Sequence, residues 1–291
     1  MLQIKKGTTG SKCSRSGGVL IRFTLYYGAN MSIRLSRFRL NDYCCQATDR
    51  FIDPYAVNPD SLIIARRGKN VLRFSPLGNN PTQPTVALVG ITPGGQSEVF
   101  ARLLGSCSVE LAAKKAAFAK GQKQIKDLLD AHGFARQLGL DLSGDLNDNP
   151  SLFTTSLVKC CLMVGGNYKY RAPDIVASPE ARFCVCNRFV ADIRKYPTLK
   201  WVVIFGEAGW EAINLLTVGS RTIYQNLEAQ EIEVLNFPHF SQNFQQRAIF
   251  RLLPEQEEIY FKDHPTARAY APAARKMRAA LLSAMQRKWP V

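Results

Sequence analysis

The stretch "VALVGITPGGQSEVFARLL", residues 86–104, decides the fold class. It begins as a short, continuous apolar run that ends in Gly90, a pattern typical of a buried parallel strand. The chain then turns at Pro93 and two glycines, and a helical pattern of apolar residues follows from Ser97. A strand that leads through a glycine-rich turn into a helix is the repeating unit of parallel α/β proteins.

The same unit recurs along the chain. Further strands are predicted at residues 152–160, 200–206 and 231–240. Helical patterns lie at about 108–138, 180–196, 207–216 and 272–289. This alternation predicts an α/β fold, a three-layer α/β/α sandwich around a central, mainly parallel four-stranded sheet.

Length and composition indicate one main domain. The 291 residues are 46% hydrophobic, which is enough for a single large core, and we expect that domain to cover residues 41–291. Residues 1–40 contain basic residues and no acidic one, and we expect a mobile arm. Its composition also fits a transit peptide, an upstream extension before a start at Met31, or a tail that contacts phosphates.

The net charge of +15 predicts a partner that carries phosphate groups, although a merely basic enzyme remains an alternative. No apolar run approaches the ~20 residues that cross a bilayer, and the N-terminus lacks a signal-peptide core. We therefore expect a cytoplasmic protein without a membrane partner, and a monomer. The eight cysteines include two adjacent pairs and one C-x-C, a set that fits neither a disulfide framework nor a C-x-x-C zinc site.

The turn after the first strand also allows a nucleotide-binding interpretation. Gly90, Gly95 and Ser97 match the pattern G-x-x-x-x-G-K-[ST], but Gln96 stands where the lysine that binds phosphate belongs. The third strand offers no aspartate for magnesium, only Glu207 after a glycine. These departures disfavour a nucleotide cofactor and leave a glycine-rich turn without chemistry as a further alternative.

In a parallel sheet, ligands bind at the carboxyl ends of the strands. Four segments at those ends, "VGITPGG", "SLVKC", "VVIFGEAGWEAI" and "FPHFSQN", together resemble the motifs of the uracil-DNA glycosylase superfamily. The resemblance covers about residues 84–245. It implies a DNA-binding enzyme that flips a base out of DNA and hydrolyses its N-glycosidic bond, leaving an abasic site without a metal or other cofactor.

Such a reaction needs a positioned water and hydrogen-bond donors that face the departing base. The resemblance places His239 as a neutral donor to the base, with the capping of a loop as its structural alternative, and Thr92 as the residue that orients water. The backbone amides around Pro93 to Gln96 would supply further donors. Expected substrate-binding residues are Gly90, Ile91, Pro93, Gly94, Gly95, Gln96, Ser156, Ser241 and Asn243. Phe244 is expected to fill the vacated stack as a wedge, with burial in the core as the alternative.

Three departures from the family pattern bear on the substrate. Thr92 stands where many relatives carry Asp or Asn, so either the reaction relies on stabilisation of the leaving base, or a carboxylate such as Glu98 enters the site. The structural alternative for Glu98 is that it complements the helix dipole. Ser156 replaces the amide that grips uracil, and Gly94 replaces an aromatic residue that excludes groups on C5. These changes predict a C5-substituted pyrimidine, such as a hydroxymethylcytosine derivative of viral DNA, and a role in antiviral defence. Uracil excision in DNA repair and a non-catalytic DNA-binding module are the alternatives.

Some branches of the superfamily hold an iron-sulfur cluster through four cysteines. Cys160 or Cys161 and Cys184 or Cys186 fall near two of those ligand positions. The N-terminal C-x-x-C is absent, however, and only Cys44-Cys45 lies nearby. The sequence therefore favours a protein without a metal cofactor, with the thiols as small buried side chains.

Overall fold

The computed structural model describes residues 61–168, 171–241 and 243–289, and the backbone of four short strands closer to the N-terminus. These strands are β1 (Leu20–Thr24), β2 (Asn30–Arg34), β3 (Phe38–Arg39) and β4 (Phe51–Ile52). β1 pairs with β2 and β3 pairs with β4, each antiparallel. Apart from these strands, the predicted arm over residues 1–40 lies outside the described residues, as does Cys44-Cys45.

A parallel four-stranded sheet forms the centre of the domain and confirms the predicted mixed α/β class. Its strands lie in the order β13 (Glu233–Phe237), β10 (Trp201–Phe205), β7 (Val86–Gly90) and β8 (Leu152–Ser156). Every residue of β7, β8 and β10 is buried. Burial on both faces explains why these strands read as apolar runs rather than as alternating patterns.

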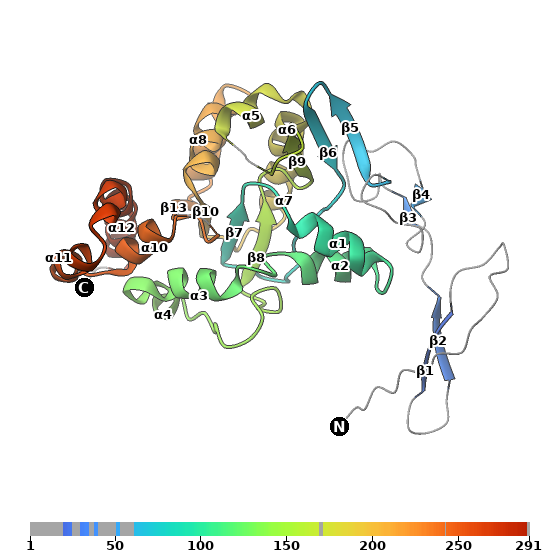
Figure 1. Ribbon diagram of the computed structural model, residues 1–291, viewed down its shortest axis with the longest axis horizontal. Helices are drawn as coiled ribbons and strands as arrows, with labels where there is room; N and C mark the ends of the chain where they lie inside the picture. The colour runs from blue at the N-terminus through green and yellow to red at the C-terminus, as the bar shows by residue number, and fades with distance from the viewer. Residues whose placement is uncertain are drawn as a thin grey trace.

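The two faces of the sheet carry separate cores. Ala87 and Val89 pack toward a cluster that includes α1 (Gln96–Leu104) and α8 (Glu207–Leu215). Val86 and Leu88 face a second cluster that includes α3 (Gln122–Asp130) and α12 (Ala271–Lys288). In Figure 1 the strands lie in the middle of the domain, with α8 on one side and α3 on the other.

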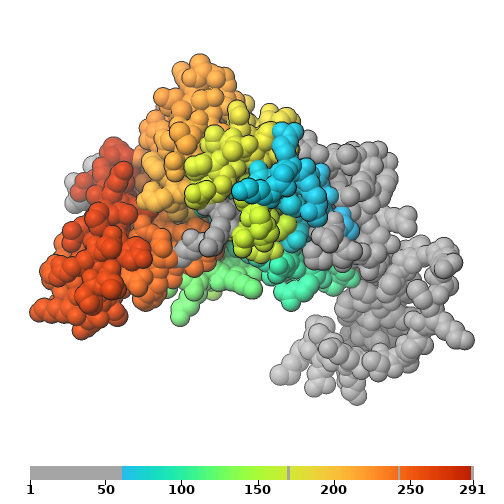
Figure 2. Space-filling model, turned by 45° about the horizontal axis from the view of Figure 1, so that its top comes forward, coloured from blue at the N-terminus to red at the C-terminus, as the bar shows by residue number. Residues whose placement is uncertain are grey.

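The remaining helices complete these layers. They are α2 (Val109–Ala116), α4 (Phe134–Gln137), α5 (Ala172–Ala177), α6 (Pro179–Phe183), α7 (Val190–Arg194), α9 (Ile223–Glu228), α10 (Phe244–Arg251) and α11 (Pro254–Asp263). The C-terminal helices, coloured red in Figure 2, form one end of the face shown there. Within the described parts of the chain, none of the helices is both long and apolar enough to span a membrane.

Some predicted elements are shorter than expected. The helical region predicted over 108–138 is three helices, because Phe118 adopts a left-handed φ of 54° and a 3-10 turn (Ala131–Gly133) precedes α4. The strand predicted over 152–160 ends at Ser156. The chain then enters β9 (Cys161–Val164), which belongs to a second, antiparallel sheet with β5 (Ile63–Arg67) and β6 (Asn70–Arg73). The sequence patterns did not predict this sheet.

The order of the strands locates a crevice. From β7 the chain runs outward to its neighbour β8, and it then returns past β7 to β10 and continues to β13. The connections that follow β7 and β10 therefore lead in opposite directions from two adjacent strands. The carboxyl ends of such a pair form the switch point at which open α/β sheets bind their ligands.

Candidate active site

A cleft of about 390 Å³ opens at this switch point. Its walls come from the turn after β7, the first residues of α8 and the loop after β13. An inner pocket of about 20 Å³ shares part of this lining and extends toward the end of β8. The cleft falls in the range of about 300–1,000 Å³ that ligand sites occupy, whereas the inner pocket has room for roughly one water molecule.

The structure brings almost all of the predicted site residues together here. Both spaces are lined by Ile91, Thr92, Pro93, Gln96 and His239. The inner pocket alone is lined by Gly90 and Ser156, and the cleft alone by Gly94, Gly95, Ser241 and Asn243. Phe244, the predicted wedge, lines neither space.

His239 is held as a neutral hydrogen-bond donor. Its Nδ1 accepts a hydrogen bond from the backbone N–H of Ser241 at 3.2 Å, so the ring proton resides on Nε2. Burial, and secondly the nearby charge of Arg247, lower the pKa of His239 to about 4. At neutral pH the imidazole is therefore uncharged, and among the described residues its Nε2–H has no hydrogen-bond partner.

The position of this ring depends on Gly206. Gly206 follows β10 with a φ of +95°, a conformation that favours glycine. A Cβ added there would lie 3.1 Å from Cδ2 of His239, closer than side chains normally pack. The chain thus needs glycine at this turn for its backbone conformation and for the approach of the imidazole.

The hydroxyl of Thr92 is hydrogen-bonded to the backbone of a neighbouring segment. Its hydroxyl donates to the carbonyl of Cys160 at 3.0 Å and accepts the N–H of Leu162 at 3.1 Å. The single hydroxyl proton is therefore already used, and Thr92 can orient a water only by accepting a hydrogen bond from it. The described contacts make Thr92 a tie between the turn after β7 and the start of β9.

Two aromatic side chains that the sequence interpretation missed close the inner pocket. Phe118 donates its backbone N–H to Oε1 of Gln96 at 2.7 Å, and its ring meets that of Phe240 edge to face at a centroid distance of 5.3 Å. The ring of Phe240 in turn stacks on His239. Phe240 could have been found from its place beside His239, but a left-handed phenylalanine between two helices leaves no sequence pattern.

Two hydroxyl side chains also line the inner pocket. One belongs to Thr155, another residue that the sequence interpretation missed, and its buried Oγ1 has no hydrogen-bond partner among the described residues. Ser156 is 6% exposed, and its Oγ lies 3.5 Å from a Cβ added at Gly90. A buried hydroxyl without a partner costs about 1–3 kcal/mol, so these groups are suited to a polar ligand or a water.

The turn after β7 does not form a phosphate-binding nest. The N–H groups of Gln96 and Ser97 donate to the carbonyls of Pro93 and Gly94 at 3.1 Å and 3.0 Å. Gln96 therefore does not offer its amide to a ligand as expected, whereas the amides of Gly94 and Gly95 have no described partner. The side chain of Ser97, which would hold magnesium in a nucleotide-binding loop, is fully buried.

Glu98 lies outside the cleft. Its carboxylate accepts the hydroxyl of Tyr168 at 2.6 Å and the residue is exposed, while Tyr168 itself lines the cleft. The structure thus gives no support to Glu98 as the carboxylate that enters the site. Glu207, in contrast, lines the cleft at the start of α8.

Phe244 is not a core residue, because 62% of it is exposed. It is the first residue of α10, and Asn243 before it adopts a left-handed φ of 50°. The guanidinium of Arg247 lies over the ring, 5.9 Å from its centroid. Asn243 lines the cleft, so Phe244, the next residue, lies directly beside the cleft.

The cysteines contact the backbone around the site. The thiol of Cys161 donates to the carbonyl of Gly94 at 3.5 Å, and the sulfur of Cys184 accepts the N–H of Lys159 at 3.3 Å. Among the residues that the structure describes, no group of three or more Cys, His, Asp or Glu side chains forms a metal site.

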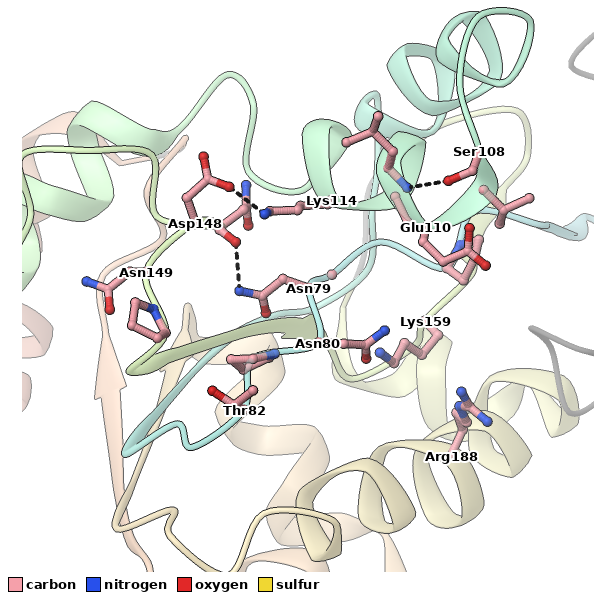
Figure 3. A pocket seen from close by; sticks show the side chains of 18 residues that line it. Asn79, Asn80, Thr82, Ser108, Glu110, Lys114, Asp148, Asn149, Lys159 and Arg188 are labelled. Atoms are coloured by element: carbon pink, nitrogen blue, oxygen red, sulfur yellow. Dashed lines mark hydrogen bonds and ion pairs between the residues drawn. The ribbon is translucent and has the colours of Figure 1, made fainter. Parts of the chain in front are cut away.

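A second cavity, of about 570 Å³, lies elsewhere, along the outer edge of β8 (Figure 3). Asn79 donates from Nδ2 to the carbonyls of Asn147 and Leu152, at 3.1 Å and 2.9 Å. Lys159 and Arg188 both pair with Asp192, and Lys114 pairs with Asp148, as the dashed line in Figure 3 shows. Asn79, Lys114, Asp148, Lys159 and Arg188 line this cavity, and each is engaged with another protein group.

Comparisons with known protein families, with curated proteins and with solved structures find no match for this chain.

Proposed function

We propose that this protein is a monofunctional DNA glycosylase with a uracil-DNA glycosylase-like fold. The observation that carries the proposal is His239, a neutral imidazole at the switch point of the sheet whose Nε2–H has no partner in the described part of the chain. The net charge of +15 supports a nucleic acid as the partner.

The proposed reaction is hydrolysis of the N-glycosidic bond of a flipped nucleotide. Water forms a bond to the anomeric carbon, the bond to the base nitrogen breaks, and its electron pair leaves with the base. The departing base carries negative charge, which the Nε2–H of His239 stabilises without the cost of burying a second charge. Phe118 and Phe240 offer aromatic faces for the base, and Ser156 offers a hydroxyl.

The size of the inner pocket limits how the base is bound. Its roughly 20 Å³ cannot hold a pyrimidine, so the rings of Phe118 and Phe240 must move or the base must lie partly in the cleft. Gly94 and Gly95 form part of the cleft wall, and a Cβ added at Gly95 would meet nothing within 4 Å. This open wall supports a pyrimidine with a bulky C5 substituent, such as a decorated hydroxymethylcytosine, and hence a role in defence against viral DNA.

The test compares the release of uracil with the release of a bulky C5-modified cytosine from the same oligonucleotide under single-turnover conditions. We expect faster release of the modified cytosine. Gly95→Tyr should selectively abolish release of the modified cytosine. Gly95 has a φ of −62°, which a tyrosine can adopt, whereas Gly94 has a left-handed φ of +57° that would strain a tyrosine. Faster uracil release would assign the protein to uracil excision in DNA repair instead.

A non-catalytic DNA-binding module is the second candidate function. The observation that favours it is the hydroxyl of Thr92, which is tied to Cys160 and Leu162 rather than free to position water. Alkali cleavage of incubated oligonucleotides separates the two candidates, because only a glycosylase leaves abasic sites. Binding without abasic sites on any base would support the module.

A further inference from the structure

Hydrolysis of an N-glycosidic bond is faster when a protein group accepts a proton from the attacking water. A carboxylate is suited to this task. A neutral hydroxyl whose proton is already engaged in a hydrogen bond is not. The hydroxyl of Thr92 already donates a hydrogen bond to the carbonyl of Cys160, and Glu98 lies outside the cleft. The acceptor must therefore come from another element of the site.

Glu207 is the one carboxylate among the described residues that line the cleft or the inner pocket. It is the first residue of α8 and directly follows Gly206, the glycine that packs against the ring of His239. Its place in the chain therefore puts it beside the imidazole that faces the leaving base.

Glu207 also differs from the carboxylates beside the two cavities. It is exposed, and no hydrogen bond or ion pair is described for it. Glu98 is held by Tyr168, and Asp192, beside the cavity at β8, is held by Lys159 at 2.9 Å. A carboxylate without a partner in the cleft retains its lone pairs for a water molecule.

We propose that Glu207 is the general base of this site, an inference that rests on the proposed glycosylase function. One carboxylate oxygen accepts a proton from the water as the water oxygen forms its bond to the anomeric carbon. The bond to the base breaks at the same time, the base receives its electron pair, and the Nε2–H of His239 stabilises the resulting anion. The proton held by Glu207 then passes to solvent.

Glu207 in the first turn of α8 also complements the helix dipole, which is a purely structural role. The experiment must separate the two roles. Glu211 lies one turn later on the same helix and is exposed, so Glu211→Ala is the matched control. Glu207→Gln preserves the shape of the side chain, and Glu207→Ala leaves space for a small carboxylate added to the solution.

The readout is single-turnover release of the base that the wild type excises, with DNA affinity measured in parallel. We expect Glu207→Gln and Glu207→Ala to slow release by ~100-fold or more, as the loss of a general base does. Affinity should remain unchanged or rise slightly, because a negative charge is removed near DNA. Formate should restore part of the rate of Glu207→Ala and none of the rate of His239→Ala, while Glu211→Ala keeps the wild-type rate.

The outcomes separate this inference from the proposed function. Wild-type release combined with an unimpaired Glu207→Gln variant overturns Glu207 as the base and leaves the glycosylase proposal intact. A slow Glu207→Ala variant that formate does not rescue, with a lowered melting temperature, assigns Glu207 a structural role and also overturns the inference. Failure of the wild type to release any base overturns the proposed function and the inference together.

Discussion

Two cavities of this molecule differ in how their polar groups are used. The cavity along the outer edge of β8 is larger, about 570 Å³ against about 390 Å³ for the cleft at the carboxyl ends of the strands. At the edge of β8, Asn79 and Lys159 are engaged with other protein groups. In the cleft, His239 and Glu207 have groups without a described partner. Volume alone would therefore select a different cavity from the one in which groups without a partner gather.

The difference has a physical basis. A buried polar network whose members are all paired stabilises the fold and is costly to disturb. A buried donor or acceptor without a partner costs stability, whereas a polar group in an open cleft is hydrated and remains available to a ligand. The comparison therefore predicts that substitutions in the cleft reduce activity, whereas substitutions at the edge of β8 reduce stability.

The largest expected effect is in the cleft. His239→Ala should slow base release by at least ~100-fold, the loss that follows removal of one donor to a developing anion. Thr92→Ala should have a smaller effect, because its hydroxyl is bound to backbone groups. Single-turnover kinetics measure both rates, and Lys114→Ala at the edge of β8 serves as a control that should match the wild type. Unchanged release by His239→Ala would remove this residue from the mechanism.

The second prediction concerns stability at the edge of β8. Asn79→Ala removes hydrogen bonds to the carbonyls of Asn147 and Leu152 and from the N–H of Thr154, all buried, and should lower the free energy of unfolding by about 2–3 kcal/mol. Asn80→Ala, at the exposed neighbouring residue, should cost less than about 0.5 kcal/mol. Urea unfolding measures both values. An Asn79→Ala variant that is as stable as Asn80→Ala would contradict the contrast between the two cavities.

A third prediction concerns how the stability of the protein depends on pH through His239. The pKa of His239 is about 4 in the folded protein and about 6.5 when unfolded, so between these values the unfolded chain binds more protons. Stability should therefore fall as pH decreases through this window, by on the order of 2 kcal/mol for this residue when its partial exposure is considered. Urea unfolding at pH 7 and pH 4 should show a larger loss in the wild type than in His239→Gln. Equal losses would mean that the imidazole is not held neutral.

The sequence predicted the sheet because buried parallel strands are continuous apolar runs. It also predicted many of the residues that line the cleft or the inner pocket, since the carboxyl ends of parallel strands meet at one edge. Gly90, Gln96, Ser156 and His239 come from three strand ends that are distant in sequence and adjacent in space.

The features that the sequence did not predict depend on tertiary contacts. Phe118 adopts its left-handed conformation where its N–H binds Gln96 and its ring packs on Phe240, and no local preference favours that conformation. The hydroxyl of Thr92 is hydrogen-bonded to Cys160 and Leu162, at the start of β9, which is a strand of the unpredicted second sheet. A motif can place a hydroxyl at a site, but it does not show what that hydroxyl already binds.

The smallest expected effect is at Phe244, whose exposed ring lies on the surface beside the cleft. Phe244 is 62% exposed, so Phe244→Ala should change stability by less than about 0.5 kcal/mol. If the ring fills the space of a flipped base, its loss should slow release of a paired base by about 10-fold and release of an unpaired base by less than about 2-fold, because only the first must be unstacked from its partner. Ile259→Ala, at a similarly exposed apolar residue on α11, is the control and should affect neither substrate. Equal losses of Phe244→Ala on both substrates would mean that the ring contributes to DNA affinity rather than to flipping.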